Sequence, residues 1–328
     1  MRAIVITKPG GPEVLSLASR PDVSPSRGEV RVRIHATAVN RADLLQRMGL
    51  YPAPEGAPAD IPGLEYAGVV DGVGDGVSEL AVGDRVFGLA PGGTYAEALV
   101  VPARAVASLP AILTFAEGAA VPEAFITAYD AMVSQAGLGS GERVLIHAVG
   151  SGVGTAAVQI ARAVGALAIG TARTPAKLDR ARALGMHHGI VAKDASFADA
   201  VIAATGSEGA DVVLELVGGA YVAEDLRCLA HRGRIVLVGT MAGASVDLNL
   251  ALLMRRRATL YGTMLRSRPL EERIDVMRTF SRHVVPLLAN QSLRPVIDRT
   301  FSWEKAADAH AYVATNEGFG KVVLEVSP

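Results

Sequence analysis

Three glycines at alternate positions, Gly150, Gly152 and Gly154, are the residues of this chain best suited to hold a phosphate group. They stand in the segment Gly-Ser-Gly-Val-Gly, where missing side chains let the chain turn sharply and let backbone N–H groups approach an anion. Together with Ala157, the last two fit the spacing G-x-G-x-x-A, which is typical of loops that bind the pyrophosphate of a dinucleotide. The spacing therefore predicts a phosphate-binding loop.

The residues on both sides of the glycines predict the elements that position this loop. Val144–Ile146 is an apolar run of strand length, and from Thr155 onward apolar residues recur at helical spacing. A strand, a glycine turn and a helix in this order open a dinucleotide-binding fold, in which the helix N-terminus offers unpaired N–H groups to the phosphates. Because glycines also make plain turns, a purely structural turn is the alternative.

The residues after the next predicted strand, Gly165–Ala172, indicate which dinucleotide would bind. Proteins that bind NAD carry an acidic residue about twenty positions after the glycines, where it holds the ribose hydroxyls. This chain has Arg173 and Lys177 there, and no acid. Both cations can form charge-assisted hydrogen bonds with a 2′-phosphate, so the sequence favours NADPH. In the alternative interpretation, Arg173 caps a loop and Lys177 is a solvated helix residue.

The length and pattern of the chain predict two domains, since 328 residues exceed the usual size of one. Residues 123–262 alternate between helices and strands, which predicts an α/β fold with a Rossmann-type, doubly wound parallel sheet. An amphipathic helix over Glu123–Gln135 is expected to open this domain. The six expected strands are Val144–His147, Leu167–Thr171, Gly189–Val191, Asp211–Leu216, Gly233–Val238 and Thr259–Gly262.

Residues 1–122 are expected to form a second, β-rich domain, which residues 263–328 complete. Val30–Val39 alternates apolar and polar residues for most of its length, the pattern of a half-buried strand. A short helix begins after Asn40, and the Pro- and Gly-rich segment Gly49–Gly63 follows as a long loop of a kind that is often functional. The later elements expected in this domain are the helix Leu270–Leu288, the strand Val296–Thr300, the helix Trp303–Thr315 and the strand Lys321–Val326.

Composition and charge restrict the class of protein. A net charge of −1 gives no electrostatic reason to expect nucleic acid or an anionic membrane as partner. The single cysteine, Cys228, excludes an intramolecular disulfide and a cysteine-rich metal site. The sequence has no apolar run of membrane-spanning length and no signal-peptide pattern at its start. These observations predict a soluble, cytoplasmic protein that acts on small molecules.

Segments spread over nearly the whole chain resemble the zinc-independent quinone oxidoreductases, the zeta-crystallin-like branch of the medium-chain dehydrogenase/reductase superfamily. The segments that carry the resemblance are Asn40–Asp43, Gly49–Pro52, Gly63–Gly68, Gly83–Val86, Glu123–Ala128, Leu145–Gly154, Leu265–Arg268 and Gly320–Glu325. The last two narrow it to the tumour-suppressor-inducible NADPH:quinone reductases and their bacterial relatives. The resemblance implies a GroES-like catalytic domain (residues 1–122 and 263–328), a Rossmann NADPH-binding domain (residues 123–262), and a homodimer formed through residues 233–262.

The resemblance also bears on metal binding and on the substrate. Zinc-dependent relatives carry a cysteine near the position of Asn40 and a His-Glu pair at Leu64-Glu65, and neither asparagine nor leucine is a plausible zinc ligand. No metal is therefore expected.

Without a Lewis acid, removal of hydride from an alcohol is unfavourable, whereas a quinone accepts hydride and delocalises the charge onto oxygen. The alternatives are reduction of the double bond of an enone or 2-alkenal, and a non-catalytic, cofactor-binding or RNA-binding role as a crystallin-like protein.

Three residues are candidates for the catalytic site. Tyr51, in the long loop, would donate a hydrogen bond to the acceptor oxygen, with a packing aromatic as the alternative. Asn40 would bond the nicotinamide ribose or orient the acceptor, unless it is a simple helix N-cap. Ser151 would bond the cofactor or line the acceptor pocket, unless it is a turn serine. The residues that the glycine loop and the two cations offer to the cofactor are Gly150, Ser151, Gly152, Val153, Gly154, Arg173 and Lys177. The resemblance implies that Thr127, Val217, Gly239, Met241, Leu265 and Ser267 also bind it.

Overall fold

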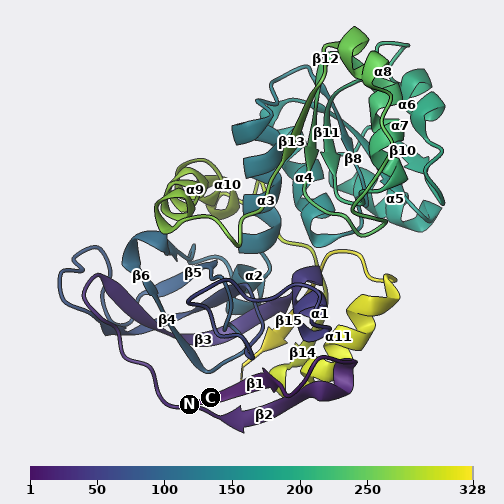
Figure 1. The fold of residues 1–328 in the computed structure, drawn as a ribbon. Helices are drawn as coiled ribbons and strands as arrows, with labels where there is room; N and C mark the ends of the chain where they lie inside the picture. The colour runs from purple at the N-terminus through teal and green to yellow at the C-terminus, as the bar shows by residue number, and fades with distance from the viewer. Residues whose placement is uncertain (327–328) are drawn as a thin grey trace. The chain divides into compact units, whose positions relative to one another are not determined.

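The computed structural model describes residues 1–326 of the chain, which divide into two compact units (Figure 1). The central unit runs from Thr127 to Met264, and the terminal unit combines Met1–Ile126 with the segment that begins at Leu265. The domain boundaries expected from the sequence, after residues 122 and 262, lie a few residues before these two crossings.

The central unit contains a six-stranded, all-parallel sheet in the order β10-β9-β8-β11-β12-β13. From β8 the chain winds outward to β10, then returns to place β11 on the other side of β8. The predicted doubly wound α/β fold is therefore confirmed, and ligands of such sheets bind where the strand order reverses. The strands are β8 Arg143–Ile146, β9 Leu167–Ala172, β10 His188–Val191, β11 Ala210–Glu215, β12 Leu229–Leu237 and β13 Thr259–Gly262.

Helices cover the central sheet because their apolar faces and the sheet's aliphatic residues are buried together. Leu145, Ile169 and Val213 from three strands form one core with Phe197 and Leu226. Helices α4 and α5 pack on β8, β9 and β10, while α6, α7 and α8 pack near β10, β11 and β12. The helices are α4 Gly152–Val164, α5 Pro175–Ala183, α6 Ala198–Ala204, α7 Ala220–Cys228 and α8 Leu250–Arg256.

The terminal unit is built on a seven-stranded sheet in the order β14-β15-β3-β4-β5-β7, with β6 paired to β3. A separate hairpin is formed by β1 and β2. Strand β15 lies between β14, to which it is parallel, and β3, to which it is antiparallel. The strands are β1 Arg2–Ile6, β2 Leu15–Ser19, β3 Glu29–Val39, β4 Glu65–Val73, β5 Arg85–Leu89, β6 Ala98–Pro102, β7 Ala107–Ser108, β14 Ile297–Ser302 and β15 Lys321–Glu325.

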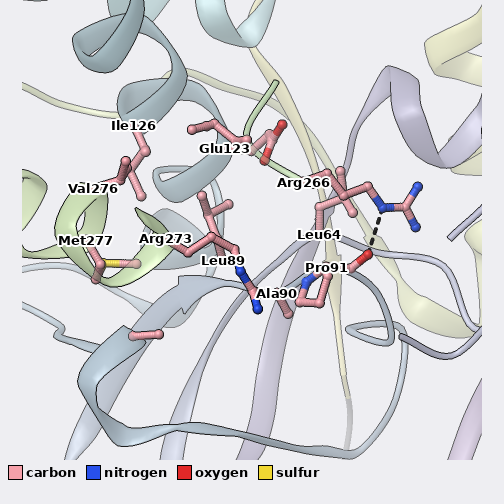
Figure 2. A pocket seen from close by; sticks show the side chains of 12 residues that line it. Leu64, Leu89, Ala90, Pro91, Glu123, Ile126, Arg266, Arg273, Val276 and Met277 are labelled. Carbon is pink, nitrogen blue, oxygen red and sulfur yellow. Dashed lines mark hydrogen bonds between the residues drawn. The ribbon is translucent and has the colours of Figure 1, made fainter. Parts of the chain in front are cut away.

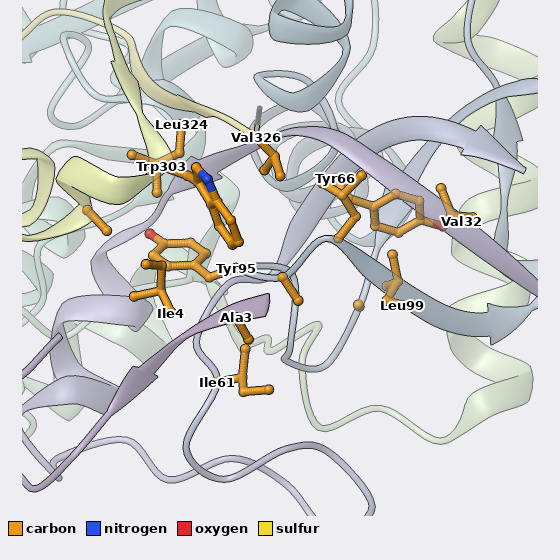
Figure 3. Close-up of a cluster of buried hydrophobic side chains, with 14 of the residues drawn as sticks. Ala3, Ile4, Val32, Ile61, Tyr66, Tyr95, Leu99, Trp303, Leu324 and Val326 are labelled. Atoms are coloured by element: carbon orange, nitrogen blue, oxygen red, sulfur yellow. The ribbon is translucent and has the colours of Figure 1, made fainter. Parts of the chain in front are cut away.

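Aromatic and aliphatic side chains fill the core of the terminal unit (Figure 3). Trp303, Tyr66 and Tyr95 are fully buried there, with Leu324 and Val326 from the end of the described chain. The helical segments of this unit are η1 Pro12–Val14, α1 Arg41–Arg47, η2 Ala103–Ala105, α2 Phe115–Ala119, η3 Pro122–Ile126, α9 Leu270–His283, α10 Val285–Ala289, η5 Trp303–Lys305 and α11 Ala306–Thr315. No helix within residues 1–326 is both long and apolar enough to span a membrane.

Two expected helices differ in detail from those observed. Glu123–Gln135 is helical, but α3 (Thr127–Tyr129) is flanked by the π-helical turns η3 and η4 (Asp130–Gln135). Apolar spacing does not distinguish these neighbouring helical periods, and π turns are frequent at functional sites. The expected helix Leu270–Leu288 is divided at Val284 into α9 and α10, because Pro286 has no N–H with which to continue a helix.

Gly154 is one of the most tightly packed glycines in the central unit. A Cβ atom there would lie 2.4 Å from the Ala148 carbonyl oxygen and 2.7 Å from Val149 Cα, both of which are backbone atoms. We expect Gly154→Ala to reduce stability by roughly 1–3 kcal/mol, since overpacking displaces backbone, and to abolish dinucleotide binding. Thermal unfolding and dinucleotide titration measure the two effects. Gly262→Ala is the control, because a Cβ atom at that position would have nothing within 4 Å; equal stability of the two variants would contradict the prediction.

Candidate functional site

The glycine loop connects β8 to α4 in the predicted order of strand, turn and helix. Helix α4 begins at Gly152, and the Ser151 hydroxyl caps it by accepting a hydrogen bond from the Gly154 N–H at 2.9 Å. The turn-serine interpretation of Ser151 thus describes its observed contact. Its contact with a cofactor stays a prediction. The loop places the N-terminus of a thirteen-residue helix, which is half-buried, at the carboxyl end of β8, and this is the geometry that binds phosphate.

Thr127, in the same unit, carries a buried hydroxyl with no partner in the described chain. The residue is 6% exposed, and its Oγ1 atom makes no hydrogen bond within residues 1–326. A buried, unsatisfied polar group costs about 1–3 kcal/mol, so such atoms commonly await a ligand. The orphaned hydroxyl and the tight Gly154 cradle both fit a nicotinamide dinucleotide, and Thr127 is a residue that would hold it.

Other predicted cofactor residues of the central unit lie at the carboxyl ends of neighbouring strands. Val217 follows β11, and Gly239 and Met241 follow β12. The two loops touch, because the Ala242 N–H donates to the Val217 carbonyl at 2.7 Å. Arg173 follows β9 directly and is exposed, and Lys177 is one turn into α5. Leu265 and Ser267, by contrast, belong to the terminal unit.

A buried polar cluster that the sequence does not predict lies next to the glycine loop. His147, at the end of β8, contacts Thr171 Oγ1 through Nδ1 at 2.8 Å and Asp225 Oδ1 through Nε2 at 2.7 Å. Glu215 lies 3.6 Å from Nε2, and its Oε1 accepts hydrogen bonds from the N–H groups of Val217 and Gly218. The cluster therefore ties the base of the nucleotide loop to the Val217 loop.

Burial governs the protonation of this cluster. It lowers the pKa of His147 to about 4, so the imidazole is neutral, and it raises the pKa of the Glu215 and Asp225 carboxyls. Two buried carboxylates side by side cannot both ionise. Glu215 Oε2 and Asp225 Oδ2 have no hydrogen-bond partner among the described residues. One ligand atom from each of His147, Glu215 and Asp225 lies within 4.8 Å of the others, and the three residue types could ligate a metal ion.

In the terminal unit, a buried ion pair joins residues far apart in the sequence. Glu65 opens β4 and is fully buried, and its Oε1 lies 2.6 Å from Lys321 Nζ, which is on β15. Asn40 completes the triangle: Nδ2 donates to Glu65 Oε1 at 2.8 Å, and Oδ1 accepts from Lys321 Nζ at 2.5 Å. Glu65 Oε2 accepts from the Glu123 backbone N–H at 2.8 Å. Every polar atom of the Glu65 carboxylate is thereby satisfied.

The residue types in and beside this triangle, Asn40–Glu65–Lys321, show whether the site could bind a catalytic zinc ion. Asn40 and Leu64 occupy the two positions at which a zinc site would need Cys or His, and the Lys321 ammonium supplies the positive charge beside Glu65. The residues present do not fit zinc. Asn40 also lies at the N-cap of α1, where its N–H donates to Asp43 Oδ2 at 2.8 Å, so its structural alternative is observed as well.

Asp43 and Gln46, both buried on α1, hold the long loop that carries Tyr51. Asp43 Oδ1 accepts from the Gly63 N–H at 3.0 Å, and Gln46 Nε2 donates to the Ala59 carbonyl at 3.1 Å. Burial raises the pKa of Asp43 to about 6. The short helix after Asn40 therefore anchors the far end of a loop that has no strand or helix of its own.

Close to this loop lies a largely apolar pocket, formed entirely by the terminal unit (Figure 2). It encloses about 500 Å³, including the part open to solvent, and Glu123, Arg266 and Arg273 contribute its charged groups. The chain enters and leaves the central unit at Ile126 and Leu265, which both line it. The lining residues are Leu64, Leu89, Ala90, Pro91, Ala105, Glu123, Ile126, Leu265, Arg266, Arg273, Val276 and Met277.

Tyr51 is linked to this pocket through Arg266. The Arg266 guanidinium lies over the Tyr51 ring, with Cζ 5.1 Å from the ring centroid. It donates to the Pro91 carbonyl at 2.7 Å and to Gln46 Oε1 at 2.6 Å, while Nη1 has no partner within the described residues. Burial raises the pKa of the Tyr51 phenol, which therefore keeps its proton. From the sequence alone, Arg266 could equally be a charged residue at the surface. In the structure it is buried, with only 9% of its surface exposed.

Comparisons with known proteins agree with this architecture. The family model for zinc-binding dehydrogenases matches residues 152–282, and that for the alcohol dehydrogenase GroES-like domain matches residues 26–111. Human quinone oxidoreductase is 34% identical over 330 residues, covering 99% of this chain and 97% of that protein.

Solved structures give the same result. A protein described as an NAD-dependent alcohol dehydrogenase is similar with a TM-score of 0.87 and 34% identity, over the full length of both chains. The JamJ enoyl reductase in its apo form is similar with a TM-score of 0.89 and 26% identity, again over both full chains.

The two units, the glycine loop and these matches define a member of the medium-chain dehydrogenase/reductase superfamily. Within it, the chain belongs to the quinone oxidoreductase family, with which it shares about a third of its residues over nearly its whole length. The protein is an oxidoreductase of a family that uses a nicotinamide cofactor.

The ion pair of the triangle predicts a large and asymmetric effect on stability. We expect Lys321→Met to destabilise the protein by about 3–5 kcal/mol, because it leaves the buried Glu65 carboxylate without its cation. The double variant Lys321→Met, Glu65→Gln is expected to recover much of that loss, since no charge is then left unpaired. Denaturant unfolding measures both variants.

An exposed ion pair provides the control for this experiment. Arg104 and Glu271 are 53% and 67% exposed at their side chains, so Arg104→Met should cost no more than about 1 kcal/mol. If Lys321→Met were no more damaging than Arg104→Met, the buried pair would not have the structural role described.

Proposed function

We propose that the protein reduces quinones with NADPH and without zinc. The observation that carries the proposal is the triangle Asn40–Glu65–Lys321. Its Glu65 follows Leu64 in the chain and accepts a hydrogen bond from the Glu123 backbone, and both of these residues line the apolar pocket. This arrangement offers no Lewis acid to stabilise an alkoxide, which oxidation of a simple alcohol needs.

An electron-poor acceptor suits these groups better. Bound nicotinamide supplies hydride, and a quinone spreads the resulting negative charge over its ring and oxygen atoms. One or two hydrogen-bond donors then suffice to stabilise the charge. Tyr51, whose phenol stays protonated beside Arg266, is the donor that we propose for the acceptor oxygen.

The pocket of the terminal unit has a lining that suits such an acceptor. Leu89, Ile126 and Met277 give it apolar walls, as is usual for small-molecule sites. Flat, weakly polar quinones match walls of this kind, with the few polar groups fixing their orientation.

The proposed preference for NADPH rests on Arg173 and Lys177. Arg173 follows the carboxyl end of β9, where the ribose of a dinucleotide bound in this fold lies. The structural relative described as NAD-dependent favours the opposite choice, so the preference needs a direct measurement.

A second candidate function is the reduction of an activated carbon–carbon double bond, favoured by the likeness to JamJ enoyl reductase.

We further propose that the protein is a cytoplasmic homodimer that binds neither nucleic acid nor membrane. The net charge of −1 supports the absence of both. At the edge of the central sheet, Leu260 of β13 is 40% exposed, which supports pairing between copies there.

The cofactor assignment predicts a difference in affinity. NADPH is expected to bind at least roughly tenfold more tightly than NADH, the effect of one or two charge-assisted contacts. Arg173→Ala should remove most of this preference, whereas Arg180→Ala, an exposed arginine on α5, should keep it. Titration of the protein with both cofactors tests this, and equal affinities in the parent protein would refute it.

The substrate assignment predicts oxidation of NADPH by ortho- or para-quinones in the presence of a chelator. Tyr51→Phe should lower kcat for quinones by roughly 10- to 1000-fold, as expected for the loss of one oxyanion donor, with unchanged cofactor affinity. Initial rates with a panel of quinones and 2-alkenals give the answer. Turnover of alkenals alone would favour the second candidate.

A further inference from the structure

Glu123 is the one carboxyl group among the residues that line the pocket (Figure 2). It lies in the π-helical turn η3, which packs on β4, β5 and α9. Its backbone N–H donates to Glu65, but no residue in the described chain forms a hydrogen bond with its side-chain carboxyl. The backbone contact fixes the residue, and the carboxyl is left to face the pocket.

The surroundings of Glu123 keep its carboxyl protonated near neutral pH. Burial is the largest cause and raises its pKa to about 8, and the carboxylates of Glu65 and Asp43 add to the effect. Lys321 and Arg266 oppose it. Lys321 is paired with Glu65 and Asn40, while Arg266 donates to Pro91 and Gln46 and keeps Nη1 without a partner among the described residues.

Arg273, on α9, is the remaining charged group that lines the pocket. Its Nε atom is buried without a partner within residues 1–326, and burial lowers its pKa, but a guanidinium still cannot release a proton near neutrality. Tyr51 is also too weak an acid to give up its proton there. Among the groups at the pocket, the carboxyl of Glu123 alone can both donate and regain a proton.

We propose that Glu123 is the general acid of this enzyme and donates a proton to the reduced oxygen of an acceptor bound in the pocket that it lines. This inference rests on the proposed reduction of quinones and deepens it. Tyr51 then stabilises charge on oxygen, while Glu123 removes that charge.

The step balances. A bound nicotinamide would supply a hydride, that is, one proton and two electrons, whose addition to a quinone leaves a hydroquinone monoanion. The O–H bond of the Glu123 carboxyl breaks, and an O–H bond forms on the anionic oxygen, giving the neutral hydroquinone and a glutamate carboxylate. The carboxylate regains a proton from water through the open side of the pocket.

The test compares Glu123→Gln with the parent across pH. Glutamine keeps the size and a hydrogen-bond donor but has no proton to transfer, so kcat for quinones should fall roughly 100-fold or more, the usual contribution of a general acid. KM and NADPH affinity should change little. Because the protonated form is the active one, parent kcat should fall as pH rises through about 8, and the variant should lack this decline.

A control and a second measurement keep the proposal falsifiable. Glu272→Gln, at an exposed position on α9, should behave as the parent does. Infrared titration of the cofactor-free protein should show a protonated carboxyl that ionises near pH 8 and is absent from Glu123→Gln. Glu123→Gln should fold as the parent does, because the backbone hydrogen bond from residue 123 to Glu65 is retained. Thermal unfolding of the variant checks this.

The outcomes separate the inference from the function on which it rests. Quinone turnover with the same kcat and pH profile in Glu123→Gln and parent would overturn the role of Glu123 alone. Ionisation of Glu123 near pH 4, as in an ordinary carboxyl, would overturn it by infrared even without an assay. No turnover of any quinone by the parent would overturn the proposed function itself, and the inference with it.

Discussion

The buried carboxylate of Glu65 constrains the whole terminal unit. A charge removed from water must be fully paired, and Glu65 obtains its partners from three other segments: Asn40 before α1, Lys321 on β15 and the backbone of Glu123. Because these partners are spread over more than 280 residues, they can meet only when β3, β4 and β15 are in register. Satisfying one carboxylate therefore fixes the position of the segments that form the pocket.

The same constraint shapes the chemistry available to the protein. The Lys321 ammonium is held by Glu65 and Asn40, so it joins these segments and is not a Lewis acid. In the proposed reaction, polarisation of the acceptor is left to Arg266 and Glu123, which line the pocket, and to Tyr51, which Arg266 contacts. In the central unit, the His147–Glu215–Asp225 cluster likewise uses buried polar groups to hold loops in place.

The sequence predicts those parts of the fold that depend on local residue patterns. Strand-length apolar runs identified all six strands of the central sheet, and the glycine spacing located the turn into α4. It did not reveal contacts made across long stretches of chain. The sequence alone does not predict a role for Lys321, although a lysine at the start of an apolar strand indicates a buried cation. Glu123 was noted within a matching segment, but its raised pKa depends on burial that only the folded chain creates.

Strand β15 has a consequence for how the protein is made. It lies inside the sheet, between β14 and β3, so the sheet that β3 begins remains incomplete until the residues of β15 have been synthesised. The central unit lies between these strands in the sequence and can fold from a continuous stretch of chain while β3 still lacks β15. Until β15 pairs with it, that part of the β3 edge is exposed to pairing with other nascent chains, and chaperone demand should therefore concentrate on the segment that contains β3.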